Sequence, residues 1–146
     1  MLYYFQLTFG FALILLVMLV FYIVAILRKP SRKKTRYIES FESSVPPEII
    51  LSAIAYFALE QNMDIEYFNE REGRITLGDK LSIWTFGFFY PIYLTSKDNG
   101  KTLVEVGVRG KASVTGTVAF RYRDKVVNGI KAVVFMNHNT LKGVTK

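Results

Sequence analysis

The sequence predicts an α+β fold in which a single N-terminal transmembrane helix is followed by a small domain with a mainly antiparallel sheet. Residues 1–27 form a long uncharged and apolar run, and a dense basic cluster follows it. Residues 37–137 then alternate between short segments of strand-like period and two longer segments of helical period. The predicted order of elements in this domain is β-α-β-β-β-β-α.

The N-terminal run has the length of a membrane anchor. Only Gln6, Thr8 and Gly10 interrupt its apolar character, and as a helix it would extend about 40 Å, against about 30 Å for the hydrocarbon core of a bilayer. A secretory signal peptide is the main alternative, and it would need a basic start, a shorter core and small residues at a cleavage site. No Lys or Arg precedes Arg28, and the junction reads Ala-Ile-Leu-Arg. We therefore predict a retained transmembrane anchor over residues 1–27.

A basic juxtamembrane linker occupies residues 28–36. By the positive-inside rule, its charge predicts that the N-terminus lies outside and that the C-terminal domain is cytoplasmic. The same residues suit contact with anionic lipid headgroups, where each Lys or Arg contributes about 1 kcal/mol. A plain stop-transfer signal is the simpler interpretation of the cluster. The candidate membrane-surface residues are Arg28, Lys29, Arg32, Lys33, Lys34 and Arg36.

The net charge of +7 does not indicate nucleic-acid binding. Six of the 19 Lys and Arg residues lie in the linker, and the rest nearly balance the 12 acidic residues. Acidic residues predominate over residues 37–96 and basic residues over residues 97–146. We therefore expect a nearly neutral domain with one acidic and one basic side, and no nucleic-acid partner.

The domain is expected to begin with a strand over residues 37–44, where aromatic, β-branched and charged residues are mixed. Pro46, Pro47 and Glu48 then favour the first turn of a helix that should run to about Asn62. Within residues 49–59 only Ser52 is not apolar, whereas a half-exposed helix would show a polar face. We expect the sheet to cover one side of this helix and a loop or the second helix to cover the other. The alternative is that the second side docks on a partner or on the bilayer.

Four further strands are expected after this helix. Residues 64–68 and 74–78 predict a hairpin because a polar loop with a glycine separates them. Strands over residues 81–94 and 102–110 should be joined by a tight turn. In the last of these strands Thr102, Val104, Val106 and Val108 share one face, and Glu105, Arg109 and Lys111 lie on the other.

The final helix is expected over about residues 118–137, and residues 138–146 should form a flexible tail. Arg121, Lys125 and Asn128 lie opposite the apolar stripe of this helix, as on a surface helix that rests on a sheet. The stripe consists of Tyr122, Val126, Ile130, Val133 and Val134.

Over residues 37–137 the order of elements resembles the single repeat of TATA-binding-protein-like modules and the helix-grip modules. The resemblance is one of topology and brings no sequence motif with it. It therefore implies a fold and no activity.

The most suggestive local feature is the aromatic segment 84–93. Pro91 lacks an amide donor, so it indicates an edge, a bend or a bulge in this strand. Either the strand is central and belongs to an ordinary core, or it presents aromatic residues to a partner outside the domain. Strand alternation places five candidate partner-docking residues on one face: Trp84, Phe86, Phe88, Tyr90 and Ile92.

No catalytic, metal or cofactor site is expected. The chain has one histidine, His138, and no cysteine, which leaves too few groups for a His-based dyad, a zinc site or a thiol-linked lipid. Gly110 and Lys111 look like the end of a phosphate-binding loop, but Glu105 and Ala112 replace its first glycine and its hydroxyl residue. We therefore expect a protein that is not an enzyme.

Two functions fit these features. The first is a non-catalytic accessory, assembly or scaffolding subunit that is anchored by one helix and binds a larger membrane protein complex. The alternative is a membrane-tethered lipid-binding module, in which the sheet and helices enclose an apolar cavity beside the bilayer and the linker recruits anionic lipid.

Overall fold

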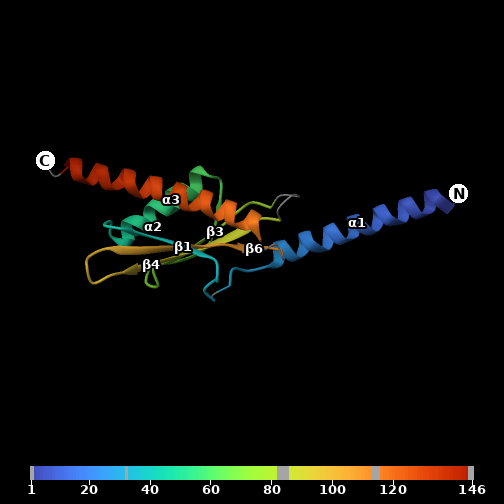
Figure 1. Ribbon diagram of the computed structural model, residues 1–146, viewed down its shortest axis with the longest axis horizontal. Coiled ribbons are helices and arrows are strands. Elements are labelled where there is room, and N and C mark those ends of the chain that lie inside the picture. The colour runs from blue at the N-terminus through green and yellow to red at the C-terminus, as the bar shows by residue number, and fades with distance from the viewer. Residues whose placement is uncertain (1, 32, 82–85, 113–115, 145–146) are drawn as a thin grey trace.

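The protein consists of a long N-terminal helix and an α+β domain in which two helices pack on one face of an antiparallel sheet (Figure 1). The computed structural model describes the backbone of residues 2–31, 33–81, 86–112 and 116–144, and the side chains within residues 9–136 of these ranges. The predicted fold class is confirmed.

The N-terminal helix α1 (Leu2–Leu27) extends away from the domain (Figure 1). Its segment Phe9–Leu27 has a mean hydropathy of 3.0 and is almost entirely exposed, so among the described residues it is long and apolar enough to cross a membrane. A signal sequence or the core helix of a soluble protein can pass the same test of length and hydropathy. Membrane insertion of α1 is therefore a proposal.

Within the described residues the sheet has the strand order β1-β5-β4-β3-β2, with β6 paired to β4, and every pairing is antiparallel. The hairpin expected at residues 64–78 is confirmed as β2 and β3. The strands are β1 (Ile38–Ser43), β2 (Asp64–Asn69), β3 (Arg74–Gly78), β4 (Phe88–Ser96), β5 (Thr102–Gly107) and β6 (Arg109–Gly110).

Helices α2 (Pro47–Glu60) and α3 (Thr117–Val144) cover the same face of the sheet (Figure 1). The two helices approach closely at Gly129, where an added Cβ would lie 2.3 Å from Cε2 of Phe57. As expected, α2 is covered by the sheet and by α3, although Tyr56 and Leu59 remain exposed. Core side chains from these layers include Ile50, Ile54, Ile75, Leu77, Ile92, Val104, Ile130 and Val134.

The expected stripe of α3 is largely confirmed. Val126, Ile130 and Val134 are buried, and Arg121 and Asn128 on the opposite side are exposed. Lys125 is exposed too, but it lies toward the space between α3 and the sheet and not on the opposite side. The helix, however, continues from Asn137 to Val144, so the prediction of a tail from residue 138 is wrong over residues 138–144. No proline interrupts this stretch, and its first glycine is Gly143, which explains why the helix can continue.

The aromatic strand begins later than predicted. Phe86 and Gly87 have backbone φ angles of 50° and 73°, in the left-handed region that is incompatible with an extended strand. β4 therefore starts at Phe88 and not at residue 81. Trp84 lies outside the described residues.

Pro91 lies in a central strand, so the edge position that it suggested is wrong. Ile92 pairs with Val106 and Phe89 pairs with Arg109, which places Pro91 opposite Gly107. Proline has no amide proton, so Pro91 cannot donate a hydrogen bond to the partner strand. The partner strand is accordingly broken at this point, because β5 ends at Gly107 and β6 begins at Arg109.

Candidate functional site

The described candidate docking residues of β4 are part of the core. Phe88, Tyr90 and Ile92 point to the helix-covered face and are fully buried, so the docking hypothesis is wrong for these three side chains. Their alternation does place them on one face, but α2 and α3 cover that face. Phe86 is half-buried, and its ring centroid lies 6.0 Å from that of Phe21 in α1.

The basic linker lies against the opposite, outer face of the sheet. Arg28 donates from Nη1 to the carbonyl oxygens of Gly110 at 3.4 Å and Lys111 at 3.3 Å. Lys34 forms an ion pair with Glu105 at 2.8 Å. Two of the candidate membrane-surface residues thus contact the domain itself. Lys29, Lys33 and Arg36 are exposed, and Arg32 lies outside the described residues.

Buried polar groups of the sheet hold this linker in place. Arg74 is 6% exposed and donates from Nη2 to the carbonyl oxygen of Ser31 at 2.6 Å. Thr35 donates from Oγ1 to the carbonyl oxygen of Val108 at 3.3 Å, beside the break in the ladder. A Cβ at Gly107 would lie 2.1 Å from Cγ2 of Thr35, so the linker fits here only because residue 107 is glycine.

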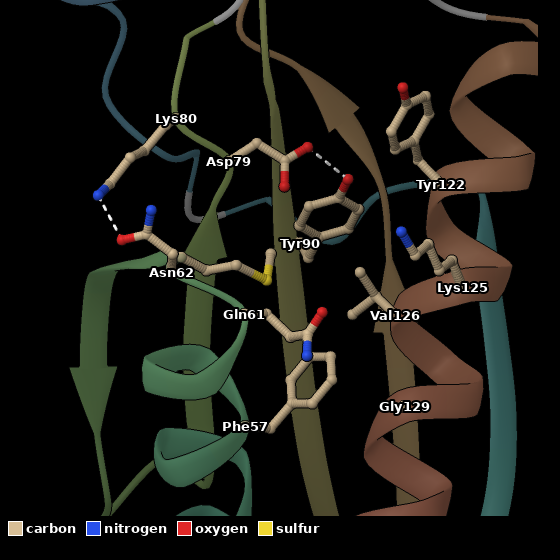
Figure 2. Close-up of a pocket in the computed structure, with 11 residues that line it drawn as sticks. Phe57, Gln61, Asn62, Asp79, Lys80, Tyr90, Tyr122, Lys125, Val126 and Gly129 are labelled. Carbon is tan, nitrogen blue, oxygen red and sulfur yellow. Dashed lines mark hydrogen bonds between the residues drawn. The ribbon is translucent and has the colours of Figure 1, made fainter.

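A cavity of about 570 Å³ lies on the helix-covered face, between the C-terminal end of α2, the first half of α3 and the sheet (Figure 2). Its volume falls within the range of about 300–1,000 Å³ that small-molecule sites occupy. The residues that line it are Phe57, Gln61, Asn62, Met63, Asp79, Lys80, Tyr90, Tyr122, Lys125, Val126 and Gly129.

The cavity combines apolar walls with a small number of polar groups. Phe57, Met63 and Val126 supply apolar surface from both sides, and the Phe57 ring packs directly against Gly129. Tyr90 Oη donates a hydrogen bond of 2.7 Å to Oδ2 of Asp79, as Figure 2 shows. An arrangement of this kind fits a ligand with an apolar body and a polar end.

Burial shapes the electrostatics of the Asp79 and Tyr90 pair. Loss of water raises the pKa of the Asp79 carboxyl above its ordinary value, although the hydrogen bond from Tyr90 and the charges of Lys111 and Lys125 oppose the shift. Burial also raises the pKa of the Tyr90 phenol, and the neighbouring Asp79 charge adds to this effect. Tyr90 is therefore a neutral donor at physiological pH.

Two lysines stand at the edge of this cavity. Lys80 follows Asp79 directly and donates to Oδ1 of Asn62 (Figure 2). Lys125 extends from α3 and acts on Asp79 through its charge. Within the described part of the chain, no group of three His, Cys, Asp or Glu residues could hold a metal ion.

A second cavity, of about 460 Å³, lies where α1 meets the domain. Tyr22, Ala25 and Ile26 of α1 line one side of it. On the domain side the nearly buried Lys111 donates from Nζ to Oε1 of Glu66 at 2.9 Å and to the carbonyl oxygen of Asp79 at 2.8 Å. Asp79 and Lys80 line both cavities.

No family model matches the chain, and no curated protein matches its sequence. Among solved structures, the crystal structure of Ara h 8.0201 aligns with 68% of this chain and 97% of that chain. The sequence identity is 16% and the TM-score is 0.38. At this score the likeness carries no argument about function.

Little in the sequence indicates the cavity. Asp79 and Lys80 follow a strand and look like ordinary solvated turn residues, and Gln61 and Asn62 look like a polar helix end. The one available signal was Gly129, a glycine within the apolar pattern of a helix, which often marks a close packing contact. It could have indicated where α2 and α3 meet, but not that space remains beside that contact.

Proposed function

We propose that this protein is a membrane-tethered module that binds a small lipid-like molecule in the cavity between the sheet and helices α2 and α3. The cavity is the observation that carries the proposal. It has the volume of a small-molecule site, apolar walls on both sides and a few polar groups. These groups come from α3, β4 and the segments that follow α2 and β3.

The tether in this proposal is α1, which crosses the bilayer with its N-terminus outside and the domain in the cytoplasm. Its exposed apolar surface and the basic residues after it support this orientation. Lys29, Lys33 and Arg36 are exposed and free to approach anionic headgroups, whereas Arg28 and Lys34 contact the sheet. The contribution of the linker to membrane binding is therefore smaller than its six charges suggest.

The accessory-subunit interpretation has less support. It rested in part on the aromatic strand, and Phe88, Tyr90 and Ile92 of that strand are buried. The over-apolar helix α2 is also mostly covered. Its residues Tyr56 and Leu59 remain exposed, and a partner of a larger complex could bind there.

Native mass spectrometry of the full chain, extracted gently from membranes, tests the proposal. Val126→Phe places a larger side chain in the cavity, and Val118→Phe makes the same change at an exposed position of the same helix. We expect bound lipid on the wild type and on Val118→Phe, and its loss from Val126→Phe. Met63→Phe provides a second filling variant at a partly buried position, in case Val126→Phe does not fold.

Two results would contradict the proposal. One is a wild-type protein that carries no lipid under conditions in which α1 remains in its detergent or bilayer. The other is lipid that stays on both filling variants in the same amount as on Val118→Phe. Appearance of a stoichiometric protein partner in the same spectra would instead favour the accessory-subunit function.

A further inference from the structure

The binding cavity lies next to the end of α1. Asp79 and Lys80 line this cavity and also the second cavity, whose opposite wall is formed by Tyr22, Ala25 and Ile26 of α1. Ala25 is buried by this contact, and the rings of Phe21 and Phe86 pack nearby. Asp79 and Lys80 thus join the edge of the binding cavity to the cavity that the last turns of α1 line.

The surface around this end of the domain suits a bilayer interface. The start of α3, strand β6 and the last turn of α1 lie at the same end of the domain (Figure 1). Val118 is 50% exposed and Tyr122 is 39% exposed on the first turns of α3, and Arg121 and Lys125 are exposed beside them. Apolar and aromatic side chains interleaved with cations are typical of a surface that contacts anionic headgroups.

The charges at the edge of the cavity favour an anionic group. Lys80 and Lys125 line it from opposite sides, one after β3 and one on α3 (Figure 2). The one acidic residue of the lining, Asp79, already accepts the hydrogen bond from Tyr90, and burial favours its protonated form. The lining therefore carries an excess of positive charge.

We infer that the ligand is a single-chain amphiphile with an anionic headgroup, drawn from the bilayer surface at the end of α1. Lys80 and Lys125 bind its headgroup, and its chain lies between Phe57, Met63 and Val126. The inference rests on the proposed function, since it specifies the ligand class and the orientation of the ligand in the same cavity. A charge-assisted contact at the headgroup would add both affinity and a fixed orientation.

Photolabelling of the full chain in phosphatidylcholine nanodiscs tests the inference. The probes are a diazirine-bearing fatty acid and the matched diazirine-bearing fatty alcohol, and mass spectrometry maps the labelled peptides. We expect the acid to label the peptides of Phe57, Met63 and Val126 about tenfold more than the alcohol, as for one or two contacts to a charged group.

Matched double variants separate the headgroup contact from general charge effects. Lys80→Gln with Lys125→Gln should reduce labelling by the acid to the level of the alcohol. Lys97→Gln with Lys131→Gln removes the same charge from residues outside the cavity lining and should leave the labelling unchanged. Excess inorganic phosphate should not compete, because the ligand is membrane-borne.

The outcomes distinguish this inference from the proposed function. Equal labelling of the cavity by acid and alcohol, unchanged in the Lys80 and Lys125 variant, would overturn the anionic headgroup while cavity binding stands. Competition by phosphate would overturn the membrane-borne ligand in favour of a free anion. If neither probe labels the wild-type protein more strongly than it labels Val126→Phe, the proposed function is contradicted, and the inference with it.

Discussion

The two faces of the sheet are covered in different ways. Two helices cover the inner face, where Ile75, Leu77 and Tyr90 are fully buried, and they leave a cavity beside their contact at Gly129. An extended segment, the basic linker, crosses the outer face, where it meets the polar residues Arg74 and Glu105. The two helices contact each other at Gly129 and leave space beside that contact, whereas the extended linker bonds to the strands that it crosses.

This difference divides the tasks of the domain. The inner face supplies the apolar burial that stabilises the fold and the walls of the binding site. The outer face fixes the linker, and therefore the position of the domain relative to α1. The neighbouring residues Thr76 and Leu77 illustrate the contrast, because both are fully buried in β3 but point to opposite faces.

The largest expected effect comes from substitutions at these two neighbours. Leu77→Ala should lower the free energy of unfolding by about 2–5 kcal/mol, because it removes core side-chain volume and leaves a cavity. Thr76→Val should change it by less than about 1 kcal/mol or stabilise the protein, since the buried Thr76 hydroxyl has no hydrogen-bond partner among the described residues. Denaturant unfolding in detergent measures both, and equal losses would refute the contrast between the faces.

Release of the linker should have a smaller effect. Arg74→Ala removes the hydrogen bond to the carbonyl oxygen of Ser31 and should cost about 1–3 kcal/mol. Hydrogen exchange in residues 28–36 should then increase while α2 and β4 remain protected. Arg71→Ala, at an exposed position near the same hairpin, is the control. Unchanged exchange in the linker of Arg74→Ala would show that Arg74 does not hold it.

The stability of the protein should also depend on pH, through the carboxyl of Asp79 at the inner face. Because burial raises the pKa of this carboxyl, the folded state binds its proton more tightly than the unfolded state. The resulting stabilisation is complete below the ordinary pKa of 3.8 and is lost as the pH rises through the folded-state value. Asp79→Asn keeps an acceptor for Tyr90, so its stability relative to the wild type should increase with pH through this window. Thermal unfolding at a series of pH values measures the difference, and parallel curves would contradict the shift.

The smallest effect on stability is expected for a solvent-exposed ion pair on the outer face. Glu105→Gln weakens the ion pair with Lys34, whose side chain is 54% exposed. Solvent screens such pairs, so the expected loss is at most about 1 kcal/mol and should disappear in high salt. A loss that persists in high salt would show that the pair contributes more to linker docking than its exposure suggests.

Local patterns were sufficient to predict most of the fold. Period-two alternation identified the β2–β3 hairpin, and the apolar stripe through Val126, Ile130 and Val134 identified the buried side of α3. The start of β4 was not predictable in this way, because the left-handed backbone of Phe86 arises at a residue that normally favours strands. The central position of Pro91 depends on a break in the partner strand, which no local pattern of β4 contains.

The candidate site was less predictable than the fold. The alternation that placed Phe88, Tyr90 and Ile92 on one face was correct, but alternation does not show which face the helices cover. The basic residues indicated a stop-transfer signal or lipid contacts, and the structure places Arg28 and Lys34 on the domain. The volume of a cavity depends on the distance between the two helices beside it. This distance is a property of tertiary packing that single residues do not encode.

The most direct test of the central claim is nuclear magnetic resonance of the full chain in nanodiscs. The valine and methionine methyl groups carry ¹³C, and a fatty acid whose acyl chain carries ¹H is added to a deuterated bilayer. If the cavity binds the amphiphile, nuclear Overhauser effects will connect the acyl chain to the methyl groups of Val126 and Met63, which line the cavity, and not only to those of the exposed Val118. Contacts to Val118 without contacts to Val126 and Met63 would show that the domain meets lipid only at its surface, and would contradict the account.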